Sequence, residues 1–592
     1  MPPRKSARTT RSQKAAAAAA TAASSSLDVP PVEEKEGGIN MDEWEREQKY
    51  GKVPKSKTSP KNTSTSENAI EEKEPETLEE LIEAEEDLST IGYIIAHIEF
   101  HVLPNHIIQL VFLFFPVHLV YLLNQDKEEI VPYFYNCLFI LIGVLVELFV
   151  ITNSAWQRFK KDRQLDEPVG YSPPKIPEFG SIYTVLISLV VCLIKYPEKL
   201  AVIGGCVLQI TDMALLPRVI ISMIMSSQLI LEYEHFNIIE IVLIPIIHAF
   251  VVYVLTEFGG KSVASYERHF FGILVVCLLF FVVPGASSQI IVIFKFLFTS
   301  YSIGFLCASP FYELYKHFAN DIGGSYIFLA ITHGAFYVLG CISTFKLLTP
   351  WLGETPVEWL LKFIKQDSER QLIVQCWIAF SVILIPSVFT FARFLPLDIR
   401  RKIWHYAIFA AVAYPLIVQP ELTSLALIGL FGVILIVEIQ RSLKLRPFGA
   451  YLSSLFEPFE DKKDKEGPLV VSYIYLVVGI LVPVLLEGCT GKGASITGLV
   501  VSGLGDSTAS ILGKRYGSHK WPHSNKTFEG TFALFVTSVA AFYGFQYLGQ
   551  NELSHNAILI SSFITALIEG ATDINDNLLS PAICYMCLLV VE

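Results

Sequence analysis

The chain has 592 residues, of which 52% are hydrophobic and only 17% are charged, and its mean hydropathy is +0.47. A single soluble core could not absorb this much apolar surface, so the composition excludes an ordinary soluble protein and predicts a membrane protein. The formal net charge of -12 does not indicate a basic partner, because much of the acid lies in a separable N-terminal segment. We expect the lipid bilayer as a partner and no nucleic acid.

Residues 1–90 differ in composition from the rest of the chain. They start with basic residues, contain an alanine stretch from Ala15 to Ala20, and end in an acidic run at 71–88. This composition predicts a disordered tail. The alanine stretch lacks the bulky apolar residues of a secretory signal, so we expect the tail to be uncleaved and cytosolic.

From Asn105 onward the sequence is a series of apolar runs. Clear examples are residues 105–124, 130–151, 237–255 and 372–389. Each is near the ~20 residues that a helix needs to cross a bilayer, and counting such runs gives roughly 13–16 spans. The runs do not alternate apolar and polar residues as the strands of a membrane β-barrel would. The expected fold is therefore all-α and polytopic.

Polar connections separate these runs. They fall near residues 156–177, 259–268, 312–324, 354–371, 443–468 and 513–531. Basic residues cluster in the first and the last of them, which predicts that both face the cytosol. Isolated polar groups within the runs, such as His333, are interpreted as hydrogen-bond partners between helices. Cys584 and Cys587 have CxxC spacing but no second pair nearby, which favours a packing role.

One polar segment has residue types that suit the binding of a nucleoside triphosphate. Residues 503–531 read GLGDSTASILGKRYGSHKWPHSNKTFEGT. Glycines allow backbone N–H groups to approach phosphate oxygens, basic residues neutralise phosphate, and carboxylates hold the divalent cation that accompanies a nucleotide. A basic loop that binds lipid headgroups is the simpler alternative.

The spacing of this segment resembles the nucleotide motif of CTP-using membrane enzymes, the dolichol kinases and the phosphatidate cytidylyltransferases. That motif is D-x-x-A, then two glycines at intervals of four, then K-K-T-x-E-G. The matching positions are Asp506, Ala509, Gly513, Gly517, Lys526, Thr527, Glu529 and Gly530. Asn525 stands where the family usually has the first lysine.

Four further elements resemble dolichol kinases and related polyprenol kinases. RRKIWH contains Arg401, Lys402 and His405 in the pattern R-K-x-x-H, and VEIQRS contains Glu438 and Arg441 in the pattern E-x-x-R. Residues 461–479 are similar to a third element, in which Tyr473 replaces the usual histidine, and residues 576–581 to the terminal D-N-L-x-x-P. The resemblance covers roughly residues 395–592, and it implies a catalytic membrane region there after an N-terminal multi-helix region at 91–394.

The resemblance implies an enzyme of the endoplasmic reticulum membrane that transfers the γ-phosphoryl group of CTP to dolichol, with a divalent cation, Mg²⁺ or Ca²⁺. The dolichyl phosphate would serve protein glycosylation. The residues implied for catalysis are Asp506, Lys526, Glu529 and His405. Those implied for CTP are Gly513, Lys514, Gly517, Lys526, Thr527, Gly530, Arg401 and Lys402. Those implied for the cation are Asp506, Glu529 and Asp576.

Several alternatives remain open at this stage. His405 could take the alcohol proton or could equally be a packing residue. The enzyme could phosphorylate another lipid alcohol, or it could be a cytidylyltransferase that makes a CDP-lipid. A transporter would not explain the nucleotide motif. The sequence leaves a homo-oligomer open.

Overall fold

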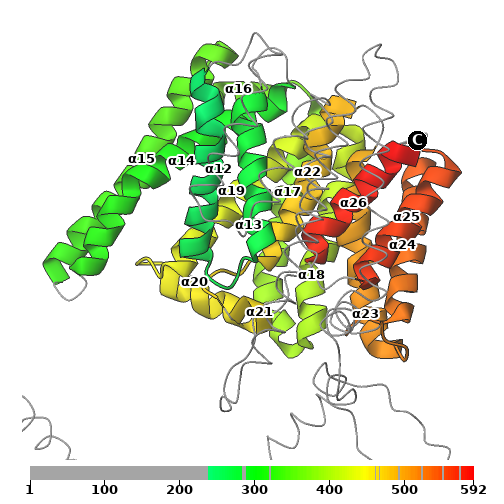
Figure 1. The fold of residues 1–592 in the computed structure, drawn as a ribbon. Helices are drawn as coiled ribbons and strands as arrows, with labels where there is room; N and C mark the ends of the chain where they lie inside the picture. The colour runs from blue at the N-terminus through cyan, green and yellow to red at the C-terminus, as the bar shows by residue number, and fades with distance from the viewer. Residues whose placement is uncertain are drawn as a thin grey trace, which may run out of the picture. The chain divides into compact units, whose positions relative to one another are not determined.

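The structure is a computed structural model that describes residues 238–591, except 283–287, 319–321, 461, 466, 491–493, 522–524, 550–552 and 572–574. The regular elements of the described residues are helices, as expected for an all-α membrane protein (Figure 1). The predicted tail at 1–90 and about half of the predicted N-terminal region at 91–394 lie outside the described residues.

Seven stretches of helix in the described part are long and apolar enough to cross a membrane. They are Val242–Gly259, Gln289–His317, Ser325–Leu352, Ser368–Phe391, Pro420–Ser442, Ala494–Tyr516 and Phe528–Tyr547. Three shorter apolar helices accompany them, at Ser472–Leu486, His555–Ala571 and Asp576–Val591. The chain is therefore a multi-pass membrane protein. The predicted total of roughly 13–16 spans includes residues that the structure does not describe.

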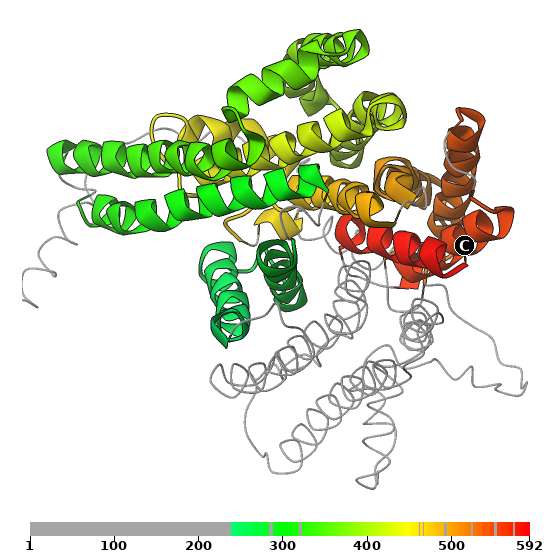
Figure 2. The ribbon, with the colours of Figure 1, turned by 90° about the horizontal axis from the view of Figure 1, so that it is seen from above.

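The first described helices form two pairs, joined by short polar connections. α12 (Ile238–Gly259) contacts α13 (Ser265–Val276), which continues into the π-helix η1 (Cys277–Phe281). α14 (Gln289–His317) lies along α15 (Ile322–Leu352) (Figure 2). The absence of a side chain at Gly304 permits this approach, because a Cβ there would lie 2.6 Å from the Phe336 carbonyl oxygen.

The middle of the described chain alternates long helices with short ones. α16 (Pro356–Lys365) begins at the N-cap Thr355, whose hydroxyl accepts from the Glu358 amide, as a capping box requires. The long helices that follow are α17 (Ser368–Phe391), α18 (Leu397–Val418) and α19 (Pro420–Ser442). The short 3₁₀ helix η2 (Ala392–Phe394) lies between α17 and α18. The polar connection at 443–468 contains α20 (Gly449–Phe456), η3 (Glu457–Phe459) and α21 (Lys462–Lys465).

The last helices enclose the largest core. They are α22 (Ser472–Thr490), η4 (Ala494–Ile496), η5 (Leu499–Gly505), α23 (Asp506–Tyr516), α24 (Phe528–Tyr547), α25 (His555–Ala571) and α26 (Asp576–Val591). α22, η5 and α26 supply many of its most buried side chains. Cys584 and Cys587 are free thiols in this core, fully buried among apolar neighbours, as the predicted packing role requires.

η5 is a π-helix that runs directly into α23. The amide of Asp506 donates to the carbonyl of Val501, five residues earlier, in place of the four-residue spacing of an α-helix. Gly503 within this turn faces Phe409 of α18, where an added Cβ would lie 3.4 Å from the Phe409 Cβ. The π-turn and its small residues therefore bring the start of α23 close to α18.

Candidate active site

A buried ion pair joins α18 to the start of α23. The Lys402 ammonium donates to Asp506 Oδ2 at 2.6 Å, and the exposed fractions of the two side chains are only 13% and 3%. Asp506 is thus held at the end of a π-turn in an apolar helix, where a lone carboxylate would be costly. R-K-x-x-H and D-x-x-A, which are distant in sequence, form one site here.

His405 belongs to the same site, one helical turn after Lys402. Its Nδ1 lies 2.8 Å from the Ser502 carbonyl oxygen and 3.6 Å from Asp506 Oδ2. Because a carbonyl oxygen only accepts, Nδ1 carries a proton. In the neutral ring, Nε2 is then the nitrogen that can accept one.

Asp576, at the start of α26, adds a second carboxylate. It interacts electrostatically with Asp506, Lys402, Arg401 and His405. Gly479 of α22 allows α26 to approach closely, since a Cβ there would lie 2.0 Å from the Asn577 carbonyl oxygen. The terminal D-N-L-x-x-P element therefore meets the other two motifs.

Arg401 connects this site to the third motif. Its guanidinium donates to the Ser472 hydroxyl at 3.0 Å, and that hydroxyl in turn donates to the Asp464 carboxylate at 3.1 Å. Both Ser472 and Asp464 lie in the matched stretch 461–479. This stretch thus positions a basic side chain of α18.

The E-x-x-R pair holds the chain that enters α22. Arg441 binds Glu438 with two hydrogen bonds, of 2.9 and 2.6 Å, and also donates to the Pro468 carbonyl. Glu438 accepts from the Val470 amide at 2.7 Å. The pair is buried and fully engaged, so its role in the described structure is to fix this connection.

Lys526 forms the other ion pair of the site. Its ammonium donates to the Glu569 carboxylate at 2.7 Å and to the Glu569 carbonyl at 2.8 Å. Burial acts to lower the pKa of Lys526, but the carboxylates of Glu569 and Asp576 outweigh it and raise that pKa above its usual range. Lys526 is therefore cationic at physiological pH, as a phosphate ligand must be.

Glu529 is engaged within the loop that joins α23 and α24. Its carboxylate accepts from the Ser518 hydroxyl at 2.7 Å and lies 2.8 Å from His519 Nδ1. Lys514 of α23 lies 3.1 Å from the Asp398 carboxylate. Their predicted roles toward cation and phosphate stay predictions.

The small residues of the motif pack α23 against the start of α24. A Cβ on Gly517 would lie 2.6 Å from the Thr527 hydroxyl and 2.2 Å from the Gly513 carbonyl, and one on Gly513 would lie 2.9 Å from the Thr527 hydroxyl. The Gly517 amide already donates to Gly513, and Thr527 is the N-cap that accepts from the Gly530 amide. Gly513 in the last turn of α23 and Gly517 directly after the helix therefore both pack against Thr527, the residue after Lys526.

The fit of a divalent cation depends on the carboxylates. The described residues contain no group of three or more His, Cys, Asp or Glu side chains arranged for a metal ion. Asp506 and Asp576 are two interacting carboxylates, which suits a nucleotide-bound cation, since Mg²⁺ usually takes one or two carboxylates together with phosphate oxygens and water. The cation-binding role of these two residues remains a prediction.

Sequence reasoning missed three residues of the site. Glu569 forms an ion pair with Lys526. Ser472 accepts a hydrogen bond from Arg401 and donates one to Asp464. Glu569 could have been found as an acidic residue within an apolar run, which is a functional signal in a membrane helix. Ser472 and Asp464 lay inside the matched stretch but had no assigned role.

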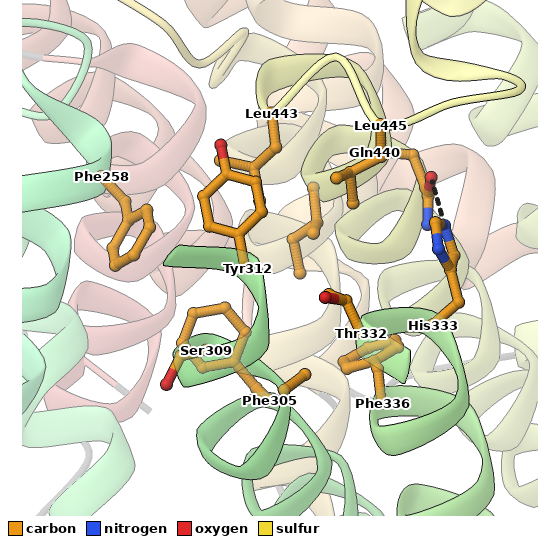
Figure 3. Close-up of a pocket in the computed structure, with 12 residues that line it drawn as sticks. Phe258, Phe305, Ser309, Tyr312, Thr332, His333, Phe336, Gln440, Leu443 and Leu445 are labelled. Carbon is orange, nitrogen blue, oxygen red and sulfur yellow. Dashed lines mark hydrogen bonds between the residues drawn. The ribbon is translucent and has the colours of Figure 1, made fainter. Parts of the chain in front are cut away.

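His333, a polar residue within a membrane span, has a structural role outside the candidate active site. His333 of α15 lies beside a small pocket of ≈ 40 Å³, shown in Figure 3, where its Nε2 is 3.3 Å from the Gln440 side chain of α19. Its Nδ1 lies 2.9 Å from the Leu329 carbonyl. His333 is therefore a hydrogen-bond partner between helices, as predicted.

Comparison with known proteins identifies relatives. Residues 57–283 match the family model for the dolichol kinase N-terminal domain, a range that lies mostly outside the described residues. The dolichol kinase of Saccharomyces cerevisiae is 35% identical over 239 residues, which are 40% of this chain and 45% of that protein. The dolichol kinase of Homo sapiens is 29% identical over 282 residues, 43% of this chain and 52% of that protein.

A shorter match involves another isoprenoid kinase. The chloroplastic farnesol kinase of Arabidopsis thaliana is 40% identical over 85 residues, 12% of this chain and 28% of that protein. No solved structure was found with significant similarity to the chain. The chain spans about half the length of each of the two dolichol kinases described above. By sequence, the chain is a relative of the dolichol kinases.

Proposed function

We propose that the protein is a dolichol kinase that uses CTP as its phosphoryl donor. The observation that carries this proposal is the buried contact between Lys402 and Asp506. A basic side chain and a carboxylate, supplied by two motifs that resemble those of CTP-using lipid kinases, are held together in the buried space between apolar helices. The similarity to dolichol kinases supports dolichol as the acceptor.

The basic side chains around the site would neutralise and orient the triphosphate, which is most of what phosphoryl transfer requires. Lys402, Arg401 and Lys526 enter it from α18 and from the loop before α24. When bound, a divalent cation would be held by Asp506 and Asp576 and would supply further charge neutralisation to the phosphates. Release of Lys402 from Asp506 would free its ammonium for a phosphate oxygen.

The proposed phosphoryl transfer requires a group that accepts the proton of the dolichol hydroxyl. The dolichol oxygen forms a bond to the γ-phosphorus, the bond from that phosphorus to the β,γ-bridging oxygen breaks, and CDP leaves. The hydroxyl proton moves to Nε2 of His405, because Nδ1 is committed to the Ser502 carbonyl. The ring would then carry its positive charge beside Asp506, 3.6 Å away.

The proposed location is the endoplasmic reticulum membrane, with the loop between α23 and α24 on the cytosolic side. The basic residues of that loop, Lys514, Arg515, Lys520 and Lys526, favour this side. CTP would reach the site from the cytosol, and the alcohol would reach it from the bilayer.

A second candidate is a kinase for a shorter isoprenoid alcohol. The match to farnesol kinase favours it, since 85 residues are 40% identical. The two candidates share the reaction and differ in the length of the acceptor. Parallel assays with farnesol, a polyprenol and dolichol would rank the acceptors.

The decisive test uses membranes that contain the full chain, supplied with dolichol and CTP labelled at either the α- or the γ-phosphate. Label in the lipid from γ-labelled CTP alone is the expected result. Label from α-labelled CTP would instead indicate a cytidylyltransferase and would refute the kinase. Membranes with Asp506→Asn serve as the control for background kinases.

A further inference from the structure

A large apolar cavity lies beside α18, the helix that also carries Lys402 of the ion pair. It has a volume of ≈ 560 Å³ and is bounded by α17, α18, α19, α20 and α22. Its walls include Trp377, Phe380, Leu384, Trp404, Ala411 and Leu430. Sites for small molecules have volumes of about 300–1,000 Å³ and mostly apolar walls, so the cavity is large enough for part of a lipid chain.

The cavity reaches the outer surface of the membrane helices. Ile385 of α17 and Leu430 and Val433 of α19 line it and are 45%, 38% and 58% exposed. Both helices are candidate membrane spans, so these side chains face the region where lipid tails lie. An apolar chain could therefore enter the cavity directly from the bilayer.

One end of the cavity is polar and carries an unsatisfied group. Tyr473 of α22 lines it, and its hydroxyl is shielded from solvent without a hydrogen-bond partner among the described residues. Its ring packs against Phe456, with 5.3 Å between ring centroids. A buried hydroxyl without a partner is costly, and a ligand that hydrogen-bonds to it would remove that cost.

This end of the cavity adjoins the candidate active site. Ser472, the residue before Tyr473, accepts the hydrogen bond from Arg401, and Arg401 precedes Lys402 on α18. Trp404, which lines the cavity, precedes His405. The cavity and the side chains proposed to hold the phosphates therefore share two elements, α18 and the start of α22.

We infer that this cavity binds the hydroxyl-bearing end of a polyisoprenoid alcohol and that Tyr473 positions the hydroxyl by a hydrogen bond. The inference rests on the proposed function and adds the acceptor site to it. The isoprene units would occupy the apolar walls, and the rest of the chain would extend past Ile385 and Val433 into lipid.

The charges at the polar end favour an alcohol over a phospholipid. Glu438 lines the cavity, and the nearby guanidinium of Arg441 is already committed to that carboxylate with two hydrogen bonds. A phosphodiester headgroup would therefore meet a carboxylate without an available cation from this pair, whereas a neutral hydroxyl can donate or accept there.

The test is photolabelling, which does not depend on catalysis. The full chain in nanodiscs is irradiated with a farnesol analogue that carries a diazirine near its hydroxyl end, and the labelled peptides are identified by mass spectrometry. We expect label on the cavity-lining segments of α17, α18, α19 or α22, competed by dolichol and not by added phosphatidylcholine. Label elsewhere, or equal competition by phosphatidylcholine, would overturn the inference.

Two variants and a control separate binding from folding. Tyr473→Phe removes a hydroxyl that has no partner in the protein, so the fold should be retained while the probe concentration for half-maximal labelling rises about two- to tenfold. Ala411→Trp fills the cavity and should abolish the label. Ala410→Trp places the same side chain at the neighbouring exposed position of α18 and should leave the labelling unchanged.

Kinetics provide a second readout that distinguishes the inference from the proposed function. If the protein is a kinase, Tyr473→Phe should raise KM for dolichol and leave KM for CTP unchanged. A labelled cavity in a protein that transfers no phosphate to any alcohol would refute the proposed function and retain the lipid site. Unchanged labelling of both Tyr473→Phe and Ala411→Trp would refute the site itself.

Discussion

The Lys402 ammonium lies 2.6 Å from Asp506 Oδ2, in a contact between residues that are 104 positions apart in sequence. Each partner is a charged residue of a different motif, and each would be destabilised in the apolar core without the other. The pair therefore has a structural role in addition to the proposed catalytic one. Its two roles make different predictions about double variants.

Asp506→Asn should lower the rate of phosphoryl transfer by at least about 100-fold, because a neutral amide neither holds a cation nor orients the triphosphate. Asp506→Ala should also lower the free energy of unfolding, by about 3–5 kcal/mol, because it leaves Lys402 buried and unpaired. Lys402→Met combined with Asp506→Leu should recover most of that stability and no activity. Thermal inactivation in detergent and γ-phosphate transfer measure the two effects, and a wild-type rate in folded Asp506→Asn would refute the catalytic role.

The ion pair between Lys526 and Glu569 predicts how fast the Lys526 amine reacts with an acylating reagent. Since Lys526 has a raised pKa in the folded protein, a smaller fraction of its amine is unprotonated at any alkaline pH. By linkage, the contribution of this pair to stability is complete below the unfolded pKa of the lysine and is lost only as pH rises through the higher folded value.

Glu569→Gln should therefore make Lys526 react faster with an amine-acylating reagent at pH ~9, because the stabilising carboxylate is removed. Lys514, which is 61% exposed and pairs with Asp398, is the internal control and should be unaffected. Mass spectrometry of peptides after brief labelling gives both rates. Equal labelling of Lys526 in the two proteins would show that Glu569 does not hold its charge.

Gly517 of the motif and Gly544 of α24 predict opposite effects on stability. Gly517→Ala should destabilise the protein, because the new Cβ would meet the Gly513 carbonyl at 2.2 Å. Gly544→Ala on α24 meets nothing within 4 Å and should stabilise by about 0.5–1 kcal/mol, through the better helix propensity of alanine. Thermal unfolding in detergent compares them, and a stabilised Gly517→Ala protein would contradict the packing role.

The glycines also show what the sequence could and could not predict. The sequence predicts that Gly513 and Gly517 lie in a loop that approaches phosphate, whereas the structure places Gly513 in α23 and Gly517 at the end of that helix, where both pack on Thr527. Composition and length were sufficient for the all-α membrane class, because spanning a bilayer requires long apolar runs. The pairing of Lys526 with Glu569 was not predictable, since it depends on how α25 packs against the loop.

The orientation of the loop is testable through Asn525, which lies in the glycosylation sequon Asn525-Lys526-Thr527 and is exposed. On the cytosolic side the sequon should never be used. We expect unmodified Asn525 in peptides analysed by mass spectrometry. We also expect a cysteine in place of Tyr516, which is 67% exposed, to react with a membrane-impermeant reagent in vesicles that expose only the cytosolic face. A glycan at Asn525, or labelling only after the lumen is opened, would reverse the orientation.

The π-turn before α23 sets the direction in which Asp506 points. The five-residue bond from Asp506 to Val501 accommodates one residue more than an α-helical turn would hold, and each residue of an α-helix rotates the chain by about 100°. Without the extra residue, the carboxylate would be turned about a quarter of a revolution or more away from Lys402. The site therefore depends on the number of residues in this turn as well as on its charged side chains. A one-residue deletion between Leu499 and Gly505 would leave every charged side chain of the site in the sequence and would still separate Asp506 from Lys402.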